Sequence, residues 1–343
     1  MASGGSGGSG LRRYLLTRLA LAPLFLLTLL TAVFVLVRVM PGDPVVASLG
    51  GRATPDRIER AQEALGLDDP ILVQYGRYLL DVLQGDLGEP LTDPRSVSQI
   101  VADLFPATVE LTVFALIVAV TLGVLVGAVA AQRRDTVFDI GGRLLGIVVY
   151  AAPVFWTGIL AQLLFANRLD LLPTGNRLSA RIVADAPTGF YLLDGIITLN
   201  WELFWDALQH LILPGVTLGL LIGGVFIRMV RVNMLQTLRS DYVESARARG
   251  IVERRVLFQH AFRNALIPIV TIMGLQAALL LGGAILTETT FSWPGLGSAL
   301  VDFVNARDYA ALQGIVTFFA LVVFVVSLLI DIINGLVDPR VRY

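Results

Sequence analysis

Residues 111–132, LTVFALIVAVTLGVLVGAVAAQ, form a run of 22 residues without a charged side chain. A helix rises about 1.5 Å per residue, so roughly 20 apolar residues cross the hydrocarbon core of a bilayer. The run is continuously apolar rather than alternating, which favours a helix over a strand of a membrane β-barrel. Five more uncharged runs of 17 to 24 residues share this character: Leu19–Val37, Leu144–Asn167, Leu211–Ile227, Ala265–Thr287 and Ala310–Ile330.

Six such runs predict an all-α polytopic membrane protein with six transmembrane helices. Helices of soluble proteins average only about 11–12 residues, so six buried core helices of this length are a poor alternative. The composition agrees, because 55% of the residues are hydrophobic, 15% are charged and the mean hydropathy is +0.74. Soluble domains carry about 25% charged residues. We assign the Gly- and Ser-rich residues 1–10 to a linker and residues 11–343 to one transmembrane domain.

Lysine and cysteine are both absent from the sequence. Without Lys there is no P-loop lysine, so the chain cannot hydrolyse ATP by the Walker mechanism. Without Cys there is no thiolate nucleophile, iron–sulfur cluster or disulfide. Two histidines, His210 and His260, are too few for a His-rich metal site. We therefore expect no metal, no cofactor and no enzymatic activity in this chain, and the net charge of −1 gives no sign of a nucleic-acid partner.

The placement of arginine predicts the orientation. If the N-terminus is cytoplasmic, the cytoplasmic segments hold 16 Arg and 7 acidic residues, whereas the outer segments hold 10 Arg and 20 acidic residues. An excess of basic residues on the cytoplasmic side is the usual rule for membrane proteins. Both termini and residues 228–264 are then cytoplasmic, and residues 41–106 and 168–210 are extracytoplasmic.

Each of the two predicted extracytoplasmic segments contains a sequence pattern that indicates local structure. Thr54-Pro55-Asp56 has the pattern of a helix start, and Gly66 suits the end of that helix. The second outer segment is rich in aromatic residues, which suits a helix at the membrane interface or a patch packed on the protein's own helices. Those residues are Phe190, Tyr191, Trp201, Phe204 and Trp205.

The cytoplasmic segment contains two predicted helices. Asp241 and Glu244 suit a cap and the first turn of a short helix, and Gly250 suits its C-terminal end. A second helix is expected over about residues 252–264. Four arginines cluster here and by themselves fit a loop touching anionic lipid headgroups: Arg247, Arg249, Arg254 and Arg255.

Ionisable residues fall at the ends of the predicted spans rather than at their centres: Glu110, Arg228, Glu288 and Asp331. Ion-coupled carriers commonly place acids or broken helices near the midplane, so this pattern disfavours a secondary transporter without excluding one. Glu288 suits either a residue facing a translocation path or an acid solvated by headgroups. Trp293-Pro294-Gly295 reads as a turn with an interface anchor.

Several short motifs resemble one family. Glu244-Ser245-Ala246 followed by Gly250 resembles the EAA-x-x-x-G motif of binding-protein-dependent ABC importer permeases, with Ser245 in place of the usual Ala. Other stretches are similar to the peptide/nickel branch: residues 40–44 (MPGDP), 260–268 (HAFRNALIP), 287–295 (TETTFSWPG) and 338–342 (DPRVR). Residues 173–175 (PTG) and 210–214 (HLILP) resemble the dipeptide permeases most.

The resemblance implies a translocation subunit of the bacterial cytoplasmic (inner) membrane that imports dipeptides or short oligopeptides. Relatives in this branch also carry nickel, glutathione, haem or oligosaccharides. Implied partners are a second homologous permease, two cytoplasmic ATPases, an extracytoplasmic substrate-binding protein and the lipid bilayer. The implied ATPase-coupling residues are Asp241, Glu244, Ser245, Ala246, Arg247 and Gly250. Glu288 is the candidate for the translocation path, and Asn176, Arg177 and Asp185 are candidates for binding-protein contact. The rivals are a secondary transporter and a membrane scaffold without a transport role.

Overall fold

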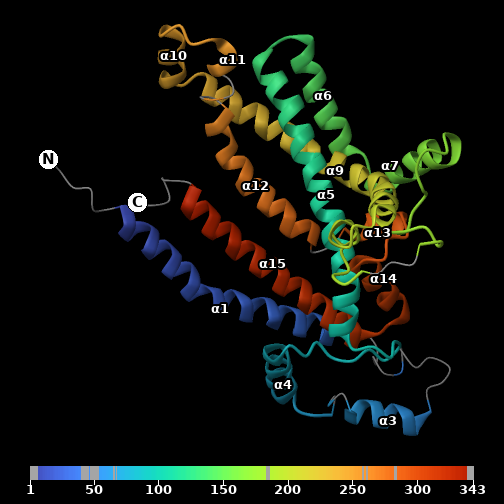
Figure 1. The fold of residues 1–343 in the computed structure, drawn as a ribbon. Coiled ribbons are helices and arrows are strands. Elements are labelled where there is room, and N and C mark those ends of the chain that lie inside the picture. The colour runs from blue at the N-terminus through green and yellow to red at the C-terminus, as the bar shows by residue number, and fades with distance from the viewer. Residues whose placement is uncertain are drawn as a thin grey trace.

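The computed structural model describes residues 7–39, 46, 54–64, 66, 68–182, 186–256, 259, 262–281 and 284–337. Within these ranges every regular element is a helix (Figure 1), which confirms the all-α class. The motifs at residues 40–44 and 338–342, together with Asp185 and His260, lie outside the described residues.

Four helices in the described ranges are long and apolar enough to cross a membrane. They contain the predicted runs that begin at Leu19, Leu111, Leu211 and Ala310. The four helices are α1 (Gly7–Val39), α5 (Val97–Gln132), α9 (Trp201–Leu238) and α15 (Tyr309–Val337). Helix α1 begins at Gly7, inside the Gly/Ser stretch predicted as a linker.

The third predicted run is a broken helix rather than one straight span. Helices α6 (Val137–Ala151) and α7 (Val154–Ala161) meet at a bend of 99°, and a π-helical stretch, Gln162–Arg168, continues α7. Proline lacks an N–H group and disfavours helical geometry in the residue before it. Ala152, which precedes Pro153, is accordingly extended, with φ −75° and ψ 129°.

The fifth predicted run is also divided. Helix α12 (Arg263–Leu281) covers most of it, and α13 (Ile285–Thr290) contains the end. The described residues therefore offer four candidate spans, or five if the bent pair counts as one. The six-span prediction is compatible with this arrangement but is not reproduced helix by helix.

Helices α5 and α9 form the centre of the protein and run in the same direction (Figure 1). Their close packing depends on glycines, as at many membrane helix interfaces. A Cβ atom on Gly123 would lie 2.3 Å from Cβ of Phe226, and one on Gly219 would lie 2.7 Å from the carbonyl oxygen of Ala115. Neither position therefore accepts a side chain without moving the opposite helix.

The remaining helices lie at the two ends of this bundle. Helices α10 (Asp241–Ala248) and α11 (Glu253–Arg255) lie at one end, and α3 (Pro55–Ala64) and α4 (Ile71–Gln84) lie at the other (Figure 1). Helix α3 begins at Pro55, as predicted, and Gly66 has a left-handed φ of +60°. Helices α8 (Tyr191–Ile197) and α14 (Leu296–Ala306) complete the described fold.

Candidate coupling segment and outer junction

Helix α10 begins at Asp241, so Ser240 rather than the predicted Asp241 occupies the N-cap position. The Ser240 hydroxyl does not cap the helix, because it donates to the carbonyl oxygen of Thr237 at 2.5 Å. Asp241 and Glu244 instead lie in the first turn, where carboxylates interact favourably with the positive end of the helix dipole. The predicted helix is correct, and its cap is displaced by one residue.

The C-terminal end of α10 has the geometry that the sequence predicts. Gly250 has φ +73°. Its N–H donates to the carbonyl oxygen of Arg247 at 2.9 Å, and the N–H of Ile251 donates to that of Ala246 at 3.3 Å. These two bonds define a Schellman motif, which favours glycine at its left-handed position. A Cβ atom on Gly250 would meet nothing within 4 Å, so the demand for glycine comes from the backbone alone.

One face of α10 is an anchor and the other is exposed. Val243 and Ala246 are both 0% exposed and join the main hydrophobic core beside Val230 and Met234 of α9. Ala246, predicted as an ATPase-coupling residue, is therefore a packing residue, because a small apolar side chain fits the contact with α9. The other five predicted coupling residues are exposed: Asp241, Glu244, Ser245, Arg247 and Gly250.

Arg247 also connects the two sides of the Gly250 turn. Its Nη2 lies 2.7 Å from Oε1 of Glu253, and its Nε lies 3.1 Å from Oε2. The hydrogen bonds from Arg247 lower the pKa of Glu253, and the same contact raises the pKa of Arg247. Glu253 begins the three-residue helix α11, which is shorter than the helix predicted over residues 252–264. Residues 257, 258, 260 and 261 of that stretch lie outside the described ranges.

An ion pair between buried Asp139 and partly buried Arg231 stabilises the end of α9 that leads into α10. Arg231 of α9 donates to both carboxylate oxygens of Asp139 of α6, at 2.5 and 2.8 Å. The Asp139 side chain is 0% exposed and also accepts the N–H of Asp135 at 3.1 Å. Paired contacts of this kind between guanidinium and carboxylate fix geometry as well as charge. Sequence reasoning missed this pair, because the partners are 92 residues apart and each looks like an ordinary loop charge.

Glu288 lies in a buried junction where α13 meets α5 and α14. It is 0% exposed. The Thr108 hydroxyl donates to its Oε1 at 2.7 Å, and the N–H of Ser298 donates to its Oε2 at 2.8 Å. Ser298 lies in the first turn of α14, so the carboxylate caps that helix. Both sequence interpretations, a path-facing acid and a headgroup-solvated acid, differ from this buried capping position.

The segment around Glu288 is attached to α5 at two further points. Trp293 is 1% exposed, and its Nε1 donates to the carbonyl oxygen of Ala107 at 2.9 Å. The Thr108 hydroxyl accepts the N–H of Leu296 at 2.9 Å. Trp293 is therefore a core residue, and its prediction as an interface anchor is wrong, because its indole N–H finds a buried acceptor on α5.

The two predicted binding-protein residues that the structure describes, Asn176 and Arg177, are in different environments. Asn176 is exposed, and its N–H donates to the carbonyl oxygen of Phe291 at 3.0 Å. Arg177 is 6% exposed, so its side chain is not on the surface. Its Nη2 lies 2.5 Å from Oε2 of Glu110 and 2.8 Å from the carbonyl oxygen of Gly189. The pairing with Glu110 compensates the charge of the buried Arg177, although its Nε has no hydrogen-bond partner among the described residues.

The sequence indicates that the aromatic residues between positions 168 and 210 form either part of a helix at the membrane interface or a patch packed on the protein's own helices. Trp201 and Trp205 are 56% and 58% exposed, as expected at an interface. Phe204 is half-buried and lies close to Gly195 of α8, since a Cβ atom on Gly195 would lie 2.8 Å from Cβ of Phe204. In the described ranges no three His, Asp or Glu side chains come together in a geometry that would hold a metal.

The fold and these contacts define an all-α, multi-pass membrane protein with a short exposed helix anchored at one end of its bundle. Two family models match the chain: the binding-protein-dependent transport system inner membrane component over residues 123–343, and its N-terminal membrane component over residues 11–112. The chain belongs to this family of binding-protein-dependent inner membrane components.

Similar proteins cover nearly the whole chain. The di/tripeptide transport system permease protein DppB of Pseudomonas aeruginosa is 43% identical over 93% of this chain and 95% of its own length. The dipeptide transport system permease protein DppB of Escherichia coli K12 is 41% identical over 96% of this chain and 99% of its own length. The protein of that name from Alkalihalophilus pseudofirmus is 38% identical, with the same two coverages of 96% and 99%.

Proposed function

We propose that this chain is the membrane-spanning permease subunit of an ABC importer that moves dipeptides or short oligopeptides into the cell. ATP hydrolysis takes place on separate subunits. The observation that carries the proposal is helix α10, which exposes Glu244 and Ser245 while Val243 and Ala246 anchor it to α9. The peptide substrate is supported by the names of the similar permeases.

Helix α9 supports a direct route from α10 to the other end of the protein. Its 38 residues correspond to about 57 Å of continuous helix. Helix α10 packs on one end of α9, whereas the other end lies beside the ion pair between Arg177 and Glu110. A displacement of the anchored helix α10 is then transmitted through α9 as a rigid-body motion, whereas a flexible loop would absorb it.

The proposal assigns residues 228–264 and both termini to the cytoplasm, with one of two ATPases docking at α10. A second, homologous permease completes the translocation path, and an extracytoplasmic binding protein delivers the peptide near Asn176. The orientation rests on the excess of arginine in the segments assigned to the cytoplasm.

A secondary transporter remains the alternative, and three of the buried acids argue against it. Glu288, Asp206 and Asp308 each accept at least one backbone N–H, so these carboxylates hold loops and helix ends together. A coupling-ion site would instead need oxygens free to bind and release an ion.

Co-purification with ATPase subunits and ATP-dependent peptide uptake in proteoliposomes test the proposal. The chain should retain its ATPases, and Glu244→Arg should reduce this retention, whereas the control Glu202→Arg, at the opposite end of the bundle, should not. Uptake driven by an ion gradient without ATPases would support the secondary transporter instead.

A further inference from the structure

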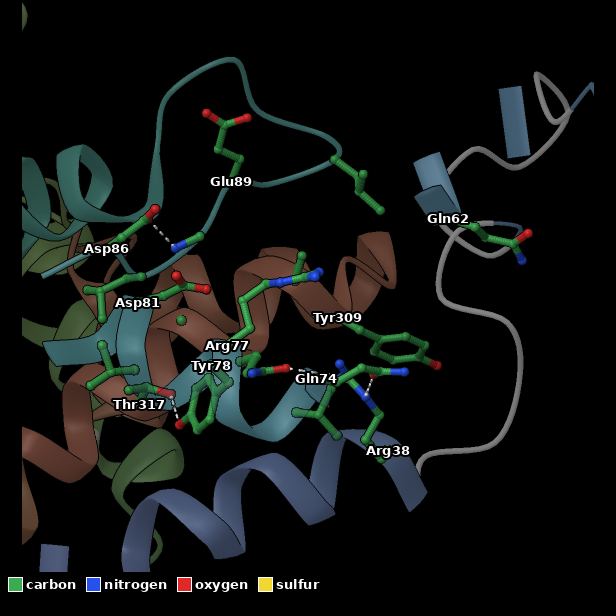
Figure 2. Close-up of a pocket in the computed structure, with 18 of the residues that line it drawn as sticks. Arg38, Gln62, Gln74, Arg77, Tyr78, Asp81, Asp86, Glu89, Tyr309 and Thr317 are labelled. Atoms are coloured by element: carbon green, nitrogen blue, oxygen red, sulfur yellow. Dashed lines mark hydrogen bonds between the residues drawn. The ribbon is translucent and has the colours of Figure 1, made fainter. Parts of the chain in front are cut away.

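A cavity of about 420 Å³ lies at the end of the bundle that carries α3 and α4 (Figure 2). Its walls come from the last turn of α1, from α4 and the loop that follows it, and from the first turns of α15. The volume falls within the range of about 300–1,000 Å³ that is usual for small-molecule sites. None of the residues predicted as functional from the sequence lines this cavity.

Fixed side chains build the cavity. Phe34 of α1 is 4% exposed and packs on the rings of Tyr75 and Tyr78 of α4, with ring centroids 5.2 and 5.7 Å away. The Tyr78 hydroxyl is hydrogen-bonded to that of Thr317 of α15 at 2.8 Å. Helix α4 is thereby attached to both α1 and α15, so the cavity is preformed.

Arg38 supplies a cation that no acidic side chain of the described residues neutralises. It is half-buried, and its Nε and Nη1 donate to the side-chain oxygens of Gln74 and Gln313 at 3.0 and 3.2 Å. The guanidinium also lies 4.8 Å from the ring centroid of Phe34. Two neutral amides and a ring hold its orientation but leave its charge uncompensated. A planar guanidinium in this state is well suited to bind a carboxylate.

Acidic residues line another part of the same cavity. Asp81, on the last turn of α4, is half-buried, and no described residue forms a hydrogen bond or ion pair with its carboxylate. Asp86 and Glu89 follow in the adjoining loop, and Figure 2 shows all three acids on the side away from Arg38. The second arginine of the cavity, Arg77, is already paired with Asp69 at 2.8 Å. Among the described residues that line it, the cavity thus has one available cation, Arg38, and separate available anions, Asp81 and Glu89.

We propose that this cavity binds a short peptide by its two charged ends. Arg38 receives the terminal carboxylate, and Asp81 with Glu89 receives the terminal ammonium group. One unpaired cation does not suit a polyanion, and a purely cationic ligand would leave Arg38 unpaired. The peptide as ligand class rests on the proposed function, and the site adds a holding position for substrate on this chain itself.

Equilibrium dialysis of radiolabelled alanyl-phenylalanine against the purified full chain in nanodiscs tests the site. The free dipeptide should bind, and its C-terminal amide and N-acetyl derivatives should each bind at least about tenfold more weakly, since each loses one charged hydrogen-bonded contact. Arg38→Gln should weaken the free dipeptide to the level of the amide while leaving the amide unchanged. Asp81→Asn should do the same with respect to the N-acetyl derivative.

The control is Arg60→Gln, which removes an exposed arginine of α3 that does not line the cavity. This variant should bind like the wild type. Equal affinity of the free dipeptide for wild type and Arg38→Gln, or no binding to the wild type at all, would overturn the site. Neither result touches the importer proposal, which is judged by ATP-dependent uptake in the full complex. The blocked peptides keep the test decisive even if a variant fails to fold.

Discussion

Replacing Gly250 with alanine should impair coupling without disturbing the rest of the protein. The residue has φ +73°, and a Cβ atom there would meet nothing within 4 Å. The cost is therefore the left-handed backbone penalty, about 1–2 kcal/mol for an L-residue with a side chain. A β-branched residue costs more, so Gly250→Val should be worse, and Gly250→Asn should be milder because Asn tolerates this conformation.

Gly141 of α6 provides a matched control. A Cβ atom there also meets nothing within 4 Å, but its φ is not positive. Gly141→Ala should be neutral or slightly stabilising, because alanine is favoured over glycine in a helix by roughly 0.5–1 kcal/mol. The same chemical change is thus predicted to have opposite signs at two equally open positions. Only the cost at Gly250, about 1–2 kcal/mol, acts on the α10 turn, and it corresponds to a shift of roughly 5- to 30-fold in the equilibrium constant of that turn.

The assay is ATP-dependent peptide uptake and ATP hydrolysis in proteoliposomes that contain the complete importer. Gly250→Ala should reduce uptake about tenfold at equal membrane abundance, with ATP hydrolysis reduced less than transport. Gly141→Ala should match the wild type in both measurements. Full uptake by both Gly250→Ala and Gly250→Val would refute the argument that the Schellman turn positions α10.

Three further predictions concern the Asp139–Arg231 ion pair, the junction around Glu288 and the orientation of the chain in the membrane. Asp139→Asn should lower the free energy of unfolding by about 1–3 kcal/mol, because the partly buried Arg231 loses its counter-charge. Thermal unfolding in detergent measures this loss, and replacing both partners by apolar residues should recover much of it. Glu288→Gln should cost about 1–3 kcal/mol in the same assay through weaker capping of α14, and an unchanged melting temperature would contradict that role. A single Cys introduced at Ser240 should resist an impermeant maleimide in intact cells and one at Ser96 should react, and the reverse pattern would invert the orientation.

Features of the fold that depend on local sequence were predictable. An uncharged run long enough to cross a bilayer locates α5 and α15, and Thr54-Pro55-Asp56 locates the start of α3. The Gly250 turn was predictable for the same reason, since its requirement is a property of one residue's backbone. Pro153, a residue that disrupts helices, lies at the sharp bend between α6 and α7, so this break also follows from local sequence.

The contacts that hold the candidate site together were not predictable, because they join distant residues. Arg177 and Glu110 are 67 positions apart, and Thr108 and Glu288 are 180 apart. From the sequence alone, without knowledge of its partner, each of these residues would be interpreted as an ordinary surface residue. Arg38 shows the converse, since its lack of an acidic partner among the described residues is apparent only in three dimensions.

Because α9 is one continuous helix, a change in its length would also change the rotation of one of its ends relative to the other. Each helical residue advances the chain by about 1.5 Å and rotates it by about 100°. One residue inserted after Phe226 would therefore turn α10 through more than a quarter of a circle relative to Asp206 and the rest of the outer end. The buried face made by Val243 and Ala246 would then point away from the core that receives it. Loops elsewhere in the chain can gain or lose residues, but the middle of α9 fixes the rotation of one end of the protein relative to the other.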